Sequence, residues 1–163
     1  MKEFKQQGES GFTLIELLLV VAIISIIAAI SIPSLLRSRM SANESVAIGA
    51  CKTFVAAETD YNTNSRPQTY TSSLACLGSG AGAGDVSFID GTMSGGVKGG
   101  YTFTLVSGGS ANELSFYAWS AAARPISYRN TGVRSFYIDQ SGITRGSDIG
   151  GGIGVLSMPP YDK

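Results

Sequence analysis

An apolar segment near the N-terminus constrains this chain more than any other feature. Residues 17–32 read LLLVVAIISIIAAISI, and only Ser25 and Ser31 interrupt the run. From Phe12 to Ile32 the segment has 21 residues, and at a rise of ~1.5 Å per residue a helix of that length matches the hydrocarbon core of a bilayer. The remainder of the 163-residue chain has little apolar material with which to bury such a helix. We therefore expect a membrane-spanning helix followed by one small domain.

Two other interpretations of this segment remain open, a buried core helix and a removable secretory signal. A secretory signal has an apolar core of about 7–15 residues, and this run is longer and includes Glu16 near its start. A retained membrane anchor is the preferred interpretation. Its orientation is not set by charge, because two Lys precede the segment and two Arg, Arg37 and Arg39, closely follow it.

Glu16 needs an explanation of its own, since a carboxylate within an apolar helix is costly and usually faces a partner. Lys5 is eleven positions before it and Arg37 is twenty-one positions after it, so neither is a helical neighbour. If the chain were cut before Phe12, the new α-amino group would lie four residues from Glu16, about one helical turn. Alternatively, Glu16 is an exposed residue at the helix start, favoured by the helix dipole.

The composition argues against an enzyme or a metalloprotein. The chain has no histidine, which removes Ser–His and Cys–His nucleophile pairs and the commonest metal ligand. Its two cysteines are too few for a four-thiolate zinc site. The formal net charge is zero, which gives no support for nucleic acid as a partner. We expect no catalytic activity, no cofactor and no metal.

The segment GFTLIEL, residues 11–17, followed by the apolar run, closely resembles the cleavage and N-methylation signature of type IV prepilins. The resemblance implies that Gly11 is the last leader residue and that Phe12 becomes the N-methylated mature N-terminus. It implies that Glu16 neutralises the terminal amine, commonly that of a neighbouring subunit, during filament assembly. Pro33 falls where such pilins often carry a helix-perturbing proline.

The same resemblance implies a function, a location and partners. The chain would be a structural subunit of a type IV pilus, made in the bacterial inner membrane and then exposed in an extracellular filament that serves adhesion or twitching motility. Its partners would be identical subunits, possible minor pilins, a prepilin peptidase and methylase, and an inner-membrane assembly platform. The segments would be a cleaved leader (1–11), a transmembrane and filament-core stem (12–36), an amphipathic helix (37–62) and a β-rich head (63–163).

Two alternative functions stay open. A pseudopilin of a type II secretion system would share the stem but form a short piston. An ordinary single-pass anchored binding domain would keep residues 1–11 attached, whereas a processed subunit would begin at Phe12.

The apolar pattern continues beyond the stem at helical spacing. The residues expected to face the domain are Val46, Ala50, Phe54, Ala57 and Tyr61. The charged residues expected largely on other faces are Glu44, Lys52, Glu58 and Asp60. The sequence NTNSRP at 62–67 is a strong stop signal. One helix, or two joined near Pro33, should therefore run from about Thr13 to about Tyr61.

The second half of the chain has short aromatic-rich segments bounded by turn residues. The predicted strands are Tyr101–Leu105, Leu114–Trp119, Arg134–Ile138 and a brief Ile143–Arg145. Their spacing suits an antiparallel sheet of three or four strands, with the amphipathic helix as its cover. The expected fold class is α+β.

Two cysteines, Cys51 and Cys76, occur in the part that would be exported. Oxidising compartments favour disulfides, so the simplest expectation is one bond between them. The alternative is two unpaired thiols.

Overall fold

The computed structural model describes residues 11–66, 68–81, 83–107 and 118–161. Its elements are α1 (Leu14–Asn64), α2 (Leu74–Ser79), α3 (Gly91–Ser94), β1 (Val97–Lys98), β2 (Tyr101–Ser107), β3 (Trp119–Pro125), β4 (Ser135–Asp139) and β5 (Arg145–Ser147). The chain divides into two compact units, Met1–Arg37 and Ser38–Lys163. The fold is α+β, as predicted.

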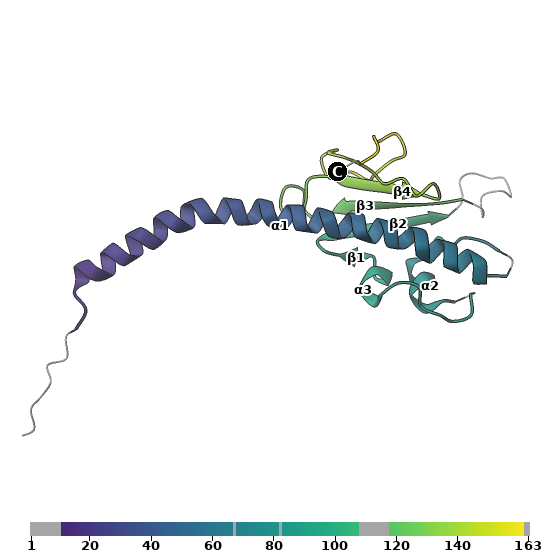
Figure 1. The fold of residues 1–163 in the computed structure, drawn as a ribbon, viewed down its shortest axis with the longest axis horizontal. Helices are drawn as coiled ribbons and strands as arrows, with labels where there is room; N and C mark the ends of the chain where they lie inside the picture. The colour runs from purple at the N-terminus through teal and green to yellow at the C-terminus, as the bar shows by residue number, and fades with distance from the viewer. Residues whose placement is uncertain (1–10, 67, 82, 108–117, 162–163) are drawn as a thin grey trace, which may run out of the picture. The chain divides into compact units, whose positions relative to one another are not determined.

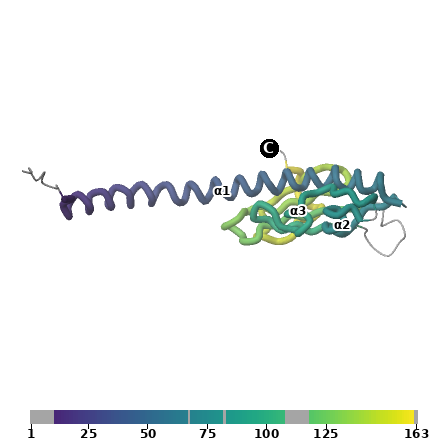
Figure 2. Tube along the Cα trace, turned by 90° about the horizontal axis from the view of Figure 1, so that it is seen from below, coloured from purple at the N-terminus to yellow at the C-terminus, as the bar shows by residue number. Residues whose placement is uncertain are grey.

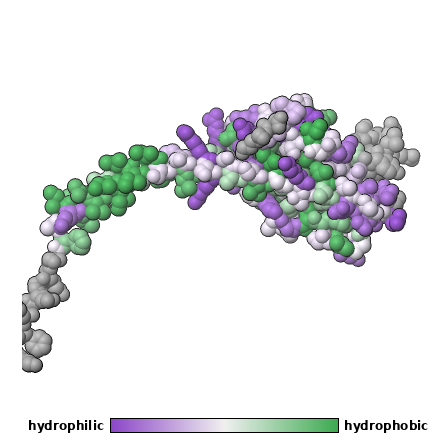
Figure 3. Space-filling model, in the orientation of Figure 1, coloured by the Kyte–Doolittle hydropathy of each residue, from purple (hydrophilic) through white to green (hydrophobic). Residues whose placement is uncertain are grey.

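In the first unit, α1 is an isolated helix whose large apolar side chains are exposed to solvent. Figure 3 shows this apolar surface as a continuous green region. The helix is long and apolar enough to cross a membrane, and no part of its most apolar stretch is buried within the molecule. α1 continues through Pro33 as one helix, so the predicted alternative of two helices joined there is wrong.

In the second unit, the C-terminal part of α1 covers one face of the sheet (Figures 1 and 2). Its buried residues are Ala47, Ala50, Cys51, Phe54, Ala57, Glu58 and Tyr61. The prediction is confirmed for Ala50, Phe54, Ala57 and Tyr61. Val46 lies against Gly99 of the second unit but stays 39 % exposed. The prediction is wrong for Glu58, which is fully buried. Glu58 lies four residues after Phe54 and three before Tyr61, which places it on the buried face of the helix.

The sheet is an antiparallel meander in the order β1-β2-β3-β4-β5. It has five strands, slightly more than the three or four expected. The predicted strands Tyr101–Leu105 and Arg134–Ile138 correspond to β2 and β4. Residues 114–117 of the third predicted strand lie outside the described residues, and β3 begins at Trp119, where that prediction ends. The brief fourth strand is displaced, since β5 starts at Arg145.

The alanines of β3 explain how α1 packs onto the sheet. Ala123 pairs with Phe103 on one side and with Phe136 on the other. All three side chains are nearly or fully buried, and the Phe103 ring contacts Phe54 of α1 at a centroid distance of 5.7 Å. A small residue between two large ones leaves room for the rings beneath the helix. The position of β3 in the sheet therefore depends on packing against β2 and β4, and not on the β propensity of its alanines.

The predicted disulfide between Cys51 and Cys76 is not present, because both residues are free cysteines. Cys51 is buried on α1. Cys76 lies on α2 and is partly buried. A disulfide needs a specific geometry, with Cα atoms within about 7 Å of each other, and the two thiols are not joined in this structure.

Candidate functional site

The start of α1 is held by reciprocal hydrogen bonds between Thr13 and Glu16. The Thr13 backbone N–H donates to Glu16 Oε2 at 2.9 Å, and the Glu16 N–H donates to Thr13 Oγ1 at 3.3 Å. The Thr13 hydroxyl also donates to Glu16 Oε2, at 2.6 Å. This arrangement is a capping box, in which two of the unpaired donors at a helix N-terminus are satisfied.

The capping box bears on the two alternatives that the sequence left open for Glu16, a partner for a new amino group and an exposed residue at the helix start. As one alternative proposed, the carboxylate is exposed at the helix start, where it also faces the positive end of the dipole. The role of Thr13 was not predicted, although the spacing Thr-x-x-Glu before an apolar run is the usual signal of such a cap. Both donors reach Oε2, and neither bond involves Oε1. The carboxylate therefore retains an oxygen for a further donor.

Gly11 and Phe12 precede α1 in a non-helical and exposed segment. The Phe12 side chain is 92 % exposed. Apart from Gly11 and its chain neighbours, no described residue has an atom within 4 Å of the position that a Cβ on Gly11 would occupy. The peptide bond between the two residues is thus accessible to an enzyme, as exposed and irregular segments generally are. The rest of the predicted leader lies outside the described residues.

The first unit presents apolar side chains around the helix. The large exposed ones in the predicted stem are Phe12, Leu14, Ile15, Leu17, Leu18, Leu19, Val20, Val21, Ile23, Ile24, Ile26, Ile27, Ile30, Ile32, Leu35 and Leu36. The Ser25 hydroxyl donates to the Val21 carbonyl at 2.7 Å, so this polar group is satisfied within the helix. An apolar surface of this extent marks contact with lipid or with other protein.

Pro33 lies inside this helix and has no N–H to donate. The carbonyl of Ala29, four residues earlier, therefore loses its usual helical donor. The residues on both sides of Pro33 remain α-helical. Pro33 removes one hydrogen bond without ending the element.

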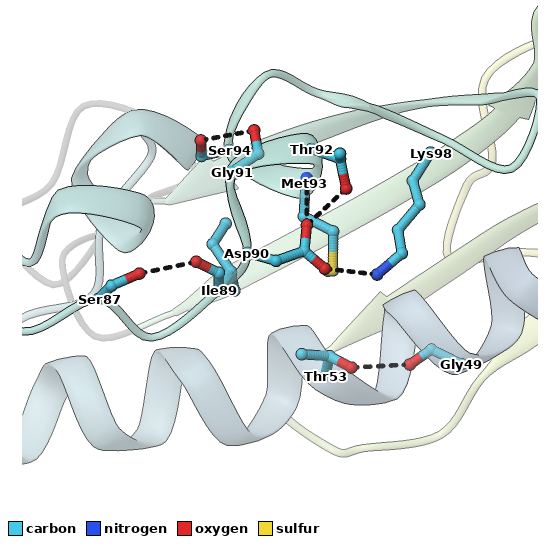
Figure 4. Close-up of polar contacts among 10 residues, drawn as sticks. All are labelled: Gly49, Thr53, Ser87, Ile89, Asp90, Gly91, Thr92, Met93, Ser94 and Lys98. Atoms are coloured by element: carbon cyan, nitrogen blue, oxygen red, sulfur yellow. Dashed lines mark hydrogen bonds and ion pairs between the residues drawn. The ribbon is translucent and has the colours of Figure 1, made fainter.

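In the second unit, the polar side chains around α3 serve the fold (Figure 4). Asp90 caps α3 by accepting from the Met93 N–H at 2.8 Å, and it also accepts from the Thr92 hydroxyl. Lys98 of β1 forms an ion pair with the same carboxylate. The hydrogen bond from Lys98 and those from Thr92 and Met93 hold the pKa of Asp90 well below its usual value. Asp90 is therefore a structural carboxylate that ties α3 to β1.

A second polar cluster joins α1 to the start of β4. Glu44 accepts from the backbone N–H groups of Val133 and Arg134, at 3.0 and 3.2 Å, and forms an ion pair with the Arg134 guanidinium at 3.4 Å. Asn43 donates to the Thr131 carbonyl at 2.8 Å. Backbone donors fix the carboxylate, so this cluster also positions α1 on the sheet. Within the described ranges, no group of three or more Cys, Asp or Glu gathers as metal ligands would.

Comparison with known proteins links these features to pili. Residues 6–32 match the family described as the prokaryotic N-terminal methylation motif. The type IV wide pilus major component PilA4 of Thermus thermophilus is 45 % identical over 71 residues, which are 44 % of this chain and 53 % of that protein. The chain thus spans about half the length of this curated relative. No solved structure matches the chain.

Proposed function

We propose that this type IV pilin-like chain, which carries the N-terminal methylation motif, is a structural subunit of a type IV pilus filament. One observation supports this most strongly. The motif residues Gly11, Phe12 and Glu16 stand at the exposed start of an apolar helix that its own chain does not cover. Such a helix is suited first to lipid and then to a bundle of identical helices.

The first step of the proposed pathway is processing. A prepilin peptidase cuts between Gly11 and Phe12, removing the leader 1–11, and Phe12 is then N-methylated. The exposure of both residues supports this step, since a peptidase must bind an extended backbone. The cut creates a charged amino group four residues before Glu16.

The second step is the pairing of charges during assembly. Among the described residues, Thr13 supplies the donors to Glu16, through Oε2. After cleavage, the methylated amine of a neighbouring subunit would approach the same carboxylate within the filament core. Two unit charges 4 Å apart attract by about 4 kcal/mol at an effective dielectric constant of about 20. This interaction would favour subunits at the correct axial position and would penalise an unpaired Glu16 in the apolar core.

In the third step, the stem moves from the membrane into the core of the filament. The stem (12–36) would first span the inner membrane, with an assembly platform extracting the subunit, and then pack against the stems of identical subunits. Its apolar residues suit both environments, and Pro33 removes one backbone hydrogen bond within it. The second unit would lie outside the membrane and form the exterior of the filament.

Shearing of intact cells tests this proposal. If the chain is a pilus subunit, the sheared surface fraction contains it as long filaments that react with an antibody to the second unit. A pseudopilin would be missing from that fraction, and loss of its gene would block secretion of enzymes. A single-pass anchored domain would stay in the membrane fraction with residues 1–11 attached. Either of these two results would contradict the proposal.

A further inference from the structure

Glu58 of α1 is an unusual carboxyl group, because its side chain is fully buried. Its Oε2 atom accepts one hydrogen bond, from the Thr71 backbone N–H at 3.1 Å. Its Oε1 atom is buried and has no hydrogen-bond partner among the described residues. A buried polar atom without a partner costs free energy, and a buried charge costs more. The geometry therefore favours the neutral carboxylic acid over the carboxylate.

Residues 68–81, here called the covering segment, close over this part of α1. Besides the bond from Thr71 to Glu58, the Tyr61 hydroxyl donates to the Ala81 carbonyl at 2.9 Å. The Tyr70 ring lies 6.5 Å from the ring of Trp119 on β3, centroid to centroid. These contacts fasten the covering segment to α1 and to the sheet, Leu77 of the segment is buried in the core, and Glu58 lies beneath Thr71.

Among the described residues, no positively charged side chain is found to act on Glu58. The titratable side chains that share this environment are Tyr61, on the same helix, and Cys76, on α2. Neither can carry positive charge, and both salt bridges among the described residues lie elsewhere. In the part of the chain that the structure describes, an ionised Glu58 would have the Thr71 N–H as its one donor. Burial raises the pKa of Glu58 to about 7. The Thr71 hydrogen bond acts in the opposite direction and offsets only part of the effect of burial.

We propose that Glu58 is a proton-controlled latch, which holds the covering segment closed when protonated and releases it when ionised. The charged form would be hydrated only if the covering segment moved away and admitted water. This inference does not rest on the proposed function, since it concerns contacts within the second unit alone.

The direction of the pH dependence follows from the raised pKa. Protonated Glu58 is favoured in the closed state, so its contribution to stability is fully present below the ordinary Glu pKa of about 4.3. That contribution falls as the pH rises and is lost as the pH passes through the folded-state pKa of about 7. The covering segment should therefore be closed in mild acid and open in mild alkali.

Trp119 provides the measurement, because it is the single tryptophan of the chain and contacts Tyr70 of the covering segment. The full-length chain in detergent micelles is titrated from pH 5 to pH 9 while tryptophan emission is recorded. The latch predicts a transition between the ordinary Glu pKa and the folded-state pKa of about 7 in the unchanged chain. Glu58→Gln, which keeps the shape and removes the charge, should abolish it. Asp60→Asn, at an exposed carboxylate two residues away, should leave it in place.

Amide hydrogen exchange at Thr71 gives a second test that needs no variant. After correction for the intrinsic pH dependence of exchange, protection of this amide should fall by about tenfold or more between pH 6 and pH 8.5. Unchanged protection at Thr71 would overturn the proposal, even if Glu58→Gln failed to fold. An emission transition that persisted in a folded Glu58→Gln variant would overturn it as well.

Discussion

At the scale of single residues, Glu16 and Glu58 show how position decides the role of a carboxyl group. Glu16 is exposed at a helix start, where two donors from Thr13 and the dipole favour its charge. Glu58 is buried and its Oε1 atom has no partner among the described residues, and both features disfavour its charge, whereas the hydrogen bond from Thr71 offsets only part of that effect. The first is suited to meet a cation from another subunit, and the second to bind a proton.

Substitution of Glu16 separates its cap role from its proposed assembly role. Glu16→Ala should insert into the membrane normally but lose most or all incorporation into filaments, because the terminal amine would have no counter-charge. Thr13→Val removes the capping hydroxyl at a cost of about 1 kcal/mol and keeps the carboxylate, so its filaments should form. Membrane fractionation and quantification of sheared filaments check both variants. Normal filament yield from Glu16→Ala would refute the assembly role.

The two free thiols should differ in reactivity. Burial raises the pKa of Cys51 to about 12, which keeps it protonated and shielded. Cys76 is half-buried and more accessible. A maleimide added to the folded chain without reductant should therefore add once, at Cys76, as measured by intact mass and peptide mapping. Two blocked cysteines that become reactive only after reduction would indicate the disulfide that the structure lacks.

At the scale of elements, the helix and strands whose apolar residues recur at regular spacing were predictable from the sequence. The long helix and strands β2 and β4 were predictable, since their apolar residues recur at the spacing of one buried face. The alanines of β3 have low strand propensity, so its extent depends on packing between Phe103 and Phe136, which the sequence alone does not reveal. The two-residue β1 is too short to leave a pattern.

The candidate site was predictable to a similar degree. Gly11, Phe12 and Glu16 were found from the motif, and the Thr13 cap could have been found from its spacing. The burial of Glu58 could not be predicted from the sequence. Charged residues are almost never fully buried, and the burial of this one depends on the covering segment.

Packing between α1 and the sheet should supply much of the stability of the second unit. Phe54→Ala removes a fully buried ring that contacts Phe103 edge-on, and should lower the free energy of unfolding by about 3–5 kcal/mol. Thr53→Ala, at the neighbouring exposed position, should change it by less than about 0.5 kcal/mol. Chemical denaturation of the full-length chain in micelles measures both. Equal effects of the two substitutions would contradict this account of the core.

At the scale of the whole molecule, the chain combines a helix that its own fold leaves uncovered with a unit that has its own core. A stable unit does not need the exposed helix, so that helix is available for lipid and for other subunits. The proposed cleavage would convert the precursor into a building unit by creating a charged amino end near Glu16. Assembly into a filament, as proposed, depends most on that conversion.

Intact-mass measurement of the chain recovered from cells tests the conversion most directly. The account predicts the mass of residues 12–163 plus one methyl group, with fragmentation placing the methyl on the Phe12 nitrogen. Cells without the peptidase should yield the full-length mass, which serves as the control. A mature chain that still carries residues 1–11 would contradict the account, since no free amine would then lie one helical turn from Glu16.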